Sequence, residues 1–243
     1  MRCILAILLT GCALALGGVA RADSIWTDAN IVTGLDLSGS IDAGDAEIQV
    51  DGIAGALRAP EIIAAINRGH FGRIGFAVFA WADSDYPVLV SWRLIGSQQE
   101  ALAASEEISN RLRALLKSDV AATLGSLTDL SAALDYGGAM LLTAPFATNH
   151  RVLNIVGNGV DNVGEGPRRA RDQLLAMGAT INGVALGHDR AIYEYFRQQV
   201  IGGRTAFVLR ATDPEALVEV LARKFVTEIV LNLDQTDMSH KFR

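Results

Sequence analysis

Two kinds of apolar segment alternate along the chain, and this alternation constrains the fold more than any other feature. Short runs rich in Val, Ile, Phe and Ala have the length and composition of buried strands. Longer segments, in which apolar residues recur every three or four positions, are typical of amphipathic helices. The predicted strands are 30–36, 73–80, 86–92, 151–156, 180–186 and 206–209. The predicted helices are 50–57, 62–66, 97–117, 127–141, 165–177, 191–200 and 214–231, with Pro60 ending or kinking the first of them.

This order predicts an α/β fold with three layers, in which helices cover both faces of a mostly parallel sheet. One connection differs from the rest. The turn at 82–85 is too short for a crossover helix, so strands 73–80 and 86–92 should pair as an antiparallel hairpin at the edge. No repeat or linker interrupts the pattern. We therefore expect one domain over residues 23–233, followed by a polar tail at 234–243.

Residues 1–22 have the pattern of a secretory signal peptide. Arg2 precedes an apolar run, and Ala20–Ala22 form a small-residue cleavage site before Asp23. The run is shorter than the roughly 20 residues of a membrane span, which favours cleavage over a retained anchor. Residues 9–12 also resemble a lipobox, so lipidation at Cys12 is an alternative. Both readings predict a periplasmic or secreted protein.

Cleavage after Ala22 would change both the cysteine content and the charge. It would remove Cys3 and Cys12, the two cysteines of the chain, so the mature protein would carry no disulfide. It would also remove Arg2 and Arg21 but no acid, which changes the net charge from −6 to −8. We expect no membrane span after cleavage. An acidic domain is also a poor candidate for binding nucleic acid or anionic lipid.

The strand at 30–36 ends in a turn that carries oxygen ligands at alternate positions. Asp36, Ser38 and Ser40 supply one carboxylate and two hydroxyls. Ligands of α/β proteins bind at the carboxyl ends of parallel strands, and Mg²⁺ and Ca²⁺ prefer oxygen donors. The turn therefore predicts a divalent cation. The alternative is that Asp and Ser stabilise the turn without a metal.

Two later features extend this pattern. Thr128 opens a predicted helix, and the turn at 157–159 follows the strand at 151–156. The ordered set resembles the von Willebrand factor type A (vWA) fold with its metal-ion-dependent adhesion site (MIDAS). A MIDAS combines a D-x-S-x-S turn, a Thr from a later loop, and an Asp before Gly after the fourth strand. The resemblance covers most of the mature chain, including the hairpin at 73–92.

The resemblance implies a role for each matching residue. Ser38 and Ser40 would ligate the ion directly, Asp36 would hold it directly or through water, and Thr128 would add a third hydroxyl. The implied ion is Mg²⁺, with Ca²⁺ and Mn²⁺ as alternatives. Because Mg²⁺ keeps several waters and this site has few charged ligands, the ion could accept a carboxylate from a protein partner. The implied function is therefore protein binding.

Three stretches resemble more closely a bacterial family of secreted proteins that has this fold and no assigned function. They are D-L-S-G-S-I-D at 36–42, T-I-N-G at 180–183 and V-I-G-G-R-T-A-F at 200–207. This closer resemblance implies a fold but no activity.

Asn158 departs from the MIDAS pattern, which has Asp at this position. Its amide oxygen can accept a hydrogen bond from a metal-bound water but adds no charge. The missing charge should weaken metal binding by about 1–3 kcal/mol. Asp129 and Asp161 are nearby carboxylates that could compensate, although neither occupies the pattern position. A metal-free scaffold that binds its partners elsewhere is therefore the main alternative.

Other chemistries have weaker support in the sequence. The Gly157-x-Gly159 pair lacks the third glycine of a dinucleotide-binding loop, because residue 162 is Asn. The serines of the turn lack the G-x-S-x-G elbow of a hydrolase. The histidines at 70, 150, 188 and 240 share no metal-ligand spacing. We expect no catalytic residue; a hydrolase that uses the ion to activate water is a second alternative.

Overall fold

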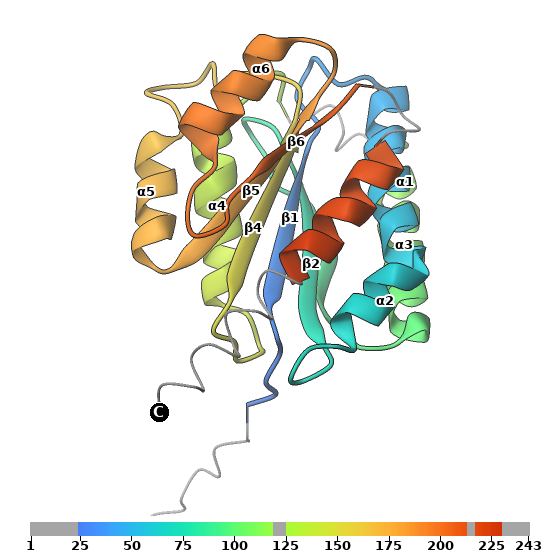
Figure 1. The fold of residues 1–243 in the computed structure, drawn as a ribbon. Helices are drawn as coiled ribbons and strands as arrows, with labels where there is room; N and C mark the ends of the chain where they lie inside the picture. The colour runs from blue at the N-terminus through green and yellow to red at the C-terminus, as the bar shows by residue number, and fades with distance from the viewer. Residues whose placement is uncertain (1–23, 119–124, 213–216, 230–243) are drawn as a thin grey trace, which may run out of the picture.

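Six strands form one sheet in the order β3-β2-β1-β4-β5-β6 (Figure 1). The computed structural model describes residues 24–118, 125–212 and 217–229. The strands are β1 (Asn30–Asp36), β2 (Ile74–Trp81), β3 (Val88–Ile95), β4 (Arg151–Gly157), β5 (Ala179–Leu186) and β6 (Val208–Ala211). All neighbours are parallel except β2 and β3, which form the antiparallel edge. The predicted architecture is therefore confirmed.

Helices cover both faces of this sheet. The helices are α1 (Ala43–Arg58), α2 (Pro60–Ile66), α3 (Gln98–Leu116), α4 (Leu130–Leu142), α5 (Arg168–Ala176) and α6 (Arg190–Tyr195), which continues as the π-helix η2 (Phe196–Val200). Residues 217–229 are also helical. In Figure 1, helices α1–α3 and the segment 217–229 lie on one face, and α4–α6 lie on the other. No helix in the described part of the chain is long and apolar enough to cross a bilayer.

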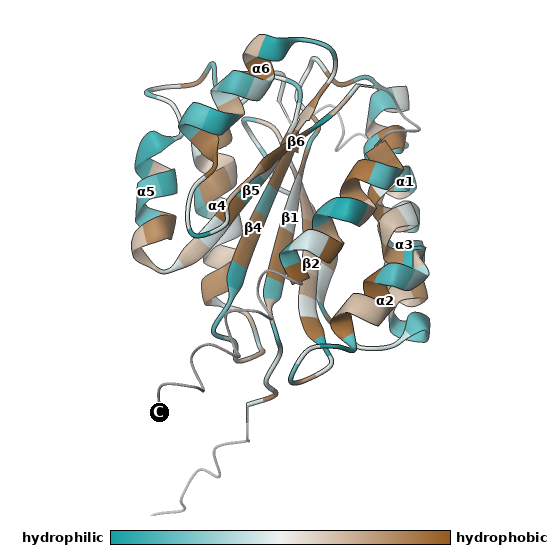
Figure 2. Ribbon diagram, viewed as in Figure 1, coloured by the Kyte–Doolittle hydropathy of each residue, from teal (hydrophilic) through white to brown (hydrophobic). Residues whose placement is uncertain are grey.

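The core consists of two apolar clusters separated by the sheet. Along β1, Ile31 and Leu35 face the α1 side, whereas Val32 faces the α4 side. Every residue of β1 is buried, as expected for a central parallel strand with helices on both faces. Figure 2 shows largely apolar strands between helices that carry both hydrophobic and hydrophilic residues.

Several predicted boundaries differ from the observed ones. Strand β3 starts at Val88 rather than at 86, and β6 spans 208–211 rather than 206–209. Helix α5 starts at Arg168 instead of 165, because Gly164 and Gly166 have φ values of 71° and 83°, outside the helical region.

The start of α4 also differs from the prediction. The helix predicted at 127–141 begins at Leu130, because Asp129 is the N-cap and its carboxylate accepts a hydrogen bond from the backbone N–H of Ala132. Leu127 precedes the helix and is 44% exposed, so it does not belong to its apolar face. The signal peptide, most of the loop at 122–126, both ends of the helix at 214–231 and the tail at 234–243 lie outside the described residues.

The connections place a topological switch point between β1 and β4. The chain leaves β1 toward α1 on one face and leaves β4 toward α5 on the other. At such a point the connections diverge and leave a crevice at the carboxyl ends of the two strands, where α/β proteins bind ligands. Asp36 is the last residue of β1, and Asn158 directly follows β4.

Candidate metal centre

Asp36 is fully buried at the end of β1, and its carboxylate is held by backbone amides. Its Oδ1 atom accepts a hydrogen bond from the Ser38 N–H (2.8 Å), and Oδ2 accepts one from the Asn158 N–H (3.4 Å). The close approach of β4 to Asp36 depends on glycine at position 157, because a Cβ atom there would lie 3.0 Å from Asp36 Oδ2. The local sequence thus brings the turns after β1 and β4 together around one carboxylate.

A chain of hydrogen-bonded oxygen atoms lies beside this carboxylate and reaches the protein surface. Thr128 Oγ1 donates to Ser38 Oγ (3.3 Å), and the hydroxyls of Ser38 and Ser40 lie 3.3 Å apart. Ser40 Oγ then donates to Asn158 Oδ1 (2.7 Å). The structure therefore brings together all five residues singled out in the sequence, although they lie in three separate segments of the chain.

One end of this chain of oxygen atoms is buried, and the other end is open to solvent. Asp36, Ser38 and Thr128 are buried, Asn158 is half-buried, and Ser40 is exposed. A ligand can therefore approach from the side of Ser40 and Asn158, while the far end stays shielded from water.

Two backbone contacts hold Thr128 in place. Its N–H donates to Asn162 Oδ1 (2.8 Å), and its carbonyl accepts from the Asn162 N–H (3.0 Å). The preceding Ser126 carbonyl accepts from the Gly39 N–H (3.1 Å), which ties this loop to the turn after β1. These hydrogen bonds hold the backbone at Thr128 next to Asn162 and close to the turn after β1.

Burial raises the pKa of Asp36, and its hydrogen bonds with Ser38 and Asn158 oppose this shift. None of the ion pairs in the described part of the chain includes Asp36. A buried carboxylate without a counter-charge is unfavourable, and a bound cation would remove this penalty. The electrostatics of the site thus favour a positively charged ligand.

The two acidic residues that could compensate for Asn158 accept hydrogen bonds from other groups. Asp129 caps α4, and Asp161 accepts hydrogen bonds from the N–H groups of Ser131 and Val163 (both 3.1 Å). In the described ranges, no three His, Cys, Asp or Glu side chains gather as metal ligands. The centre is therefore built from hydroxyls, one amide oxygen and one carboxylate.

Acidic side chains nevertheless surround the neighbouring hairpin. The pKa of Tyr86 is raised to about 12 by burial and by the charges of Asp129, Asp83, Asp135 and Asp85. A concentration of negative charge beside an open site raises the local concentration of cations.

Comparisons with known proteins agree with this architecture. A family model described as "Protein of unknown function (DUF1194)" matches residues 26–233. The chain belongs to that family. This confirms the closer resemblance inferred from the sequence. No curated protein matches the chain.

Solved structures with the same fold are vWA domains of low sequence identity. They include the vWF domain of the pili tip protein Mfa5 from Porphyromonas gingivalis, with 10% identity, a TM-score of 0.59, and coverage of 87% of this chain and 97% of that one. The pilus adhesin SpaC from Lactobacillus rhamnosus GG has 12% identity and a TM-score of 0.58, with coverage of 87% and 31%. The mussel byssus protein PTMP1, whose MIDAS motif is occupied by zinc, has 14% identity and a TM-score of 0.59, with coverage of 85% and 49%.

These likenesses confirm the vWA-like fold. The chain spans less than half of the SpaC and PTMP1 chains.

Gln49 and Asn162 support the site but were not predicted from the sequence. Gln49 Nε2 donates to the backbone carbonyl of Asp36 (2.8 Å) and so fixes the end of β1 from helix α1. A signal for Gln49 exists, because it lies three residues after Ala46 and four before Ile53, on the buried face of the helix. A polar residue at a core position requires a partner. We find no comparable signal for Asn162.

Proposed function

We propose that this chain is a periplasmic or secreted protein-binding module that holds a divalent cation at the carboxyl edge of its sheet. Asp36, Ser38, Ser40 and Thr128 would hold the ion, and the amide oxygen of Asn158 would accept a hydrogen bond from a metal-bound water. The observation that carries the proposal is the continuous chain of oxygen atoms beside a buried carboxylate without a counter-charge. Mg²⁺ is the proposed ion, with Ca²⁺ and Mn²⁺ as alternatives.

The ion would supply an open coordination position for an acidic side chain of a partner protein. Most of its protein ligands are neutral hydroxyls, so the ion keeps much of its positive charge and remains attractive to a carboxylate. The graded exposure of the site supports this, because the shielded end can hold the ion while the exposed end admits a ligand. We propose a binding role rather than a catalytic one.

Titration of the purified protein with MgCl₂ and MnCl₂, followed by calorimetry and thermal unfolding, tests the metal. We expect saturable binding and a higher unfolding temperature that EDTA reverses. Asp36→Ala should abolish both effects, whereas Asp51→Asn, which removes an exposed charge from α1, should leave them unchanged. The metal claim fails if the wild type does not respond, or if Asp36→Ala responds equally.

A matched pair of probes tests the proposed capture of a carboxylate. N-acetyl-aspartate methylamide should shift the amide signals of Ser40 and Asn158 in NMR spectra of the Mg²⁺-loaded protein. The asparagine analogue should not, and EDTA should remove the effect. Equal shifts with both probes would contradict the proposed recognition of an acidic group.

A metal-free scaffold is the second candidate, and Asn158 favours it. The hydrogen bonds of Asn158 with Ser40 already satisfy the exposed end of the oxygen chain without an ion. This candidate predicts that Asn158→Asp creates a metal affinity that the wild type lacks. Saturable binding of Mg²⁺ or Mn²⁺ by the wild type would rule it out.

A further inference from the structure

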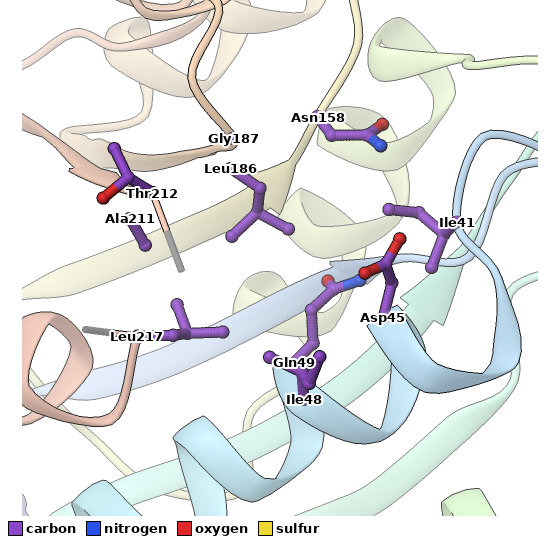
Figure 3. Close-up of a pocket in the computed structure, with 10 residues that line it drawn as sticks. All are labelled: Ile41, Asp45, Ile48, Gln49, Asn158, Leu186, Gly187, Ala211, Thr212 and Leu217. Carbon is purple, nitrogen blue, oxygen red and sulfur yellow. The ribbon is translucent and has the colours of Figure 1, made fainter. Parts of the chain in front are cut away.

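A pocket of about 160 Å³ lies beside the candidate metal centre, between α1 and the carboxyl ends of β5 and β6 (Figure 3). Ile41 and Ile48 line it on the α1 side, and Leu186 and Leu217 line it on the other side. Cavities of about 150 Å³ in other proteins admit a molecule as large as benzene. The pocket can therefore take the apolar part of one side chain or small ligand.

Asn158 also lines this pocket. The same side chain accepts the hydrogen bond from Ser40 that ends the chain of oxygen atoms. A partner bound at the metal centre would therefore have its neighbouring residue close to the pocket.

The polar side chains of the α1 wall offer hydrogen-bond acceptors that lack donors. Gln49 is 1% exposed, and its Nε2 atom donates to Asp36, but its Oε1 atom has no hydrogen-bond partner. Figure 3 shows this oxygen on the side of the amide that faces Leu186 and Leu217. Asp45 lies one helical turn earlier, and its exposed carboxylate forms no hydrogen bond or ion pair with any described residue.

These two acceptors and the four apolar residues define the chemistry of a fitting ligand. A buried carbonyl without a donor is unfavourable, so a ligand that donates to Gln49 gains affinity. The carboxylate of Asp45 makes a cationic donor better than a neutral one, because charge-assisted hydrogen bonds are stronger. An aliphatic stem that ends in an ammonium group meets both requirements, since the methylene groups of lysine can contact the apolar walls while its ammonium group donates to the two acceptors.

We propose that this pocket binds a lysine side chain of the partner protein. Its methylene groups would contact Ile41, Ile48, Leu186 and Leu217, and its ammonium group would donate to Gln49 and Asp45. The partner would thus present a lysine close to the acidic residue that reaches the metal centre. Only the statement that this lysine belongs to a partner protein rests on the proposed function. Binding of a lysine side chain to the pocket can be tested without metal.

Two matched probes test the pocket in the presence of EDTA. N-acetyl-lysine methylamide and N-acetyl-norleucine methylamide share the same four-carbon stem, but only the first carries the ammonium group. We expect the lysine probe to bind in the millimolar range and to shift the backbone amides of Ile48 and Gly187 in NMR titrations at fixed ionic strength. The norleucine probe should bind at least tenfold more weakly, because it lacks the charge-assisted hydrogen bonds of the ammonium group.

Three variants test whether the lysine probe binds in the pocket or responds only to the overall charge of the protein. Asp45→Asn should weaken binding of the lysine probe about fivefold and leave the norleucine probe unchanged. Asp51→Asn removes the same charge from the same helix outside the pocket and should weaken binding less than twofold. Gln49→Met removes the unpartnered carbonyl and should also weaken the lysine probe; Asp45→Asn remains decisive if this variant does not fold.

Each remaining outcome is informative. Equal affinity for both probes, or an Asp45→Asn variant that binds like the wild type, would overturn the lysine pocket. If the lysine probe binds selectively while Mg²⁺ does not bind, the pocket stands and the proposed metal function fails. If Mg²⁺ binds but neither probe does, the metal function stands and the pocket proposal fails.

Discussion

Two places beside strands β1 and β4 each hold a buried carboxylate, and they differ in how its charge is balanced. Midway along the sheet, Thr33 of β1 is in register with Asn154 of β4, beneath the helical segment 217–229. At the carboxyl edge, Asp36 meets Asn158. Both places contain a buried carboxylate, but only the interior one also contains a buried cation.

The interior carboxylate belongs to Glu228, and the chain itself supplies its counter-charge. Glu228 forms a buried ion pair with Lys224 and accepts hydrogen bonds from Asn182 Nδ2 (2.6 Å) and Asn154 Nδ2 (3.2 Å). The Lys224 ammonium also lies 5.4 Å from the ring centre of Phe225, within cation–π range. Burial lowers the pKa of Lys224, and the charge of Glu228 opposes this shift.

The carboxylate at the edge has hydrogen bonds but no cation. Asp36 is held by N–H groups, and the hydroxyls beside it lead to solvent. The contrast separates two uses of buried charge in one sheet. A carboxylate neutralised by its own chain stabilises the fold, whereas the one left without a counter-charge is where we propose that an external cation binds.

Breaking the interior pair should have the largest effect. Lys224→Met leaves Glu228 as an uncompensated buried charge, so we expect the free energy of unfolding to fall by about 3–5 kcal/mol in urea denaturation. The double variant Lys224→Met with Glu228→Gln should recover part of this loss, because no charge then remains buried. A loss below about 1 kcal/mol for the single variant would contradict the assigned role of the pair.

Adding charge at the edge should have the next largest effect. Asn158→Asp restores the residue of the MIDAS pattern and should strengthen Mg²⁺ binding by about 1–3 kcal/mol, measured by calorimetry. Asn149→Asp is a matched control, since it adds the same charge just before the other end of β4 and should leave the metal affinity unchanged. Equal effects of both variants would point to overall charge rather than to the site.

Removing charge at the edge should separate stability from metal binding. In EDTA, Asp36→Asn removes a buried charge but also replaces one of two acceptor oxygens with a donor, so the free energy of unfolding should stay within about 1 kcal/mol of the wild type. The same variant should no longer be stabilised by Mg²⁺. Urea unfolding with and without Mg²⁺ measures both effects, and equal stabilisation of the variant and the wild type by Mg²⁺ would contradict the role of Asp36.

The smallest effect should come from a single hydroxyl. Thr128→Val keeps the shape of the side chain but removes its oxygen, and should lower the Mg²⁺ affinity about threefold, in the range of one neutral interaction of about 0.5–1.5 kcal/mol. Calorimetry on this variant shows whether Thr128 contributes to the metal site. An unchanged affinity would exclude it as a ligand.

Most of the fold, and the order of the site residues, could be predicted because they depend on local patterns. The alternation of strands and helices gave the sheet, and the strand-end position of Asp36 placed the turn at its carboxyl edge. The start of α5 could not be predicted in this way. Residues 165–167 fit a helical pattern, and only the backbone angles at Gly164 and Gly166 show that the helix begins later.

The interior network could not be predicted, because it depends on contacts between distant segments. Lys224 and Glu228 are four residues apart, a spacing typical of an ion pair on a helix surface. Their burial is possible only because Asn154 and Asn182 supply hydrogen bonds from two strands. Within the predicted helix at 214–231, Val218 is 37% exposed, whereas its neighbour Leu217 is buried.

Gly157 also affects how this site can evolve. Because the absence of a side chain at Gly157 lets β4 lie close to Asp36, the backbone determines the position of residue 158. Asn and Asp have nearly the same shape, so either can occupy that position without moving the strands. A single-residue change could therefore adjust the affinity of the proposed centre for a cation, while substitution at Gly157 would disturb the backbone that makes such adjustment possible.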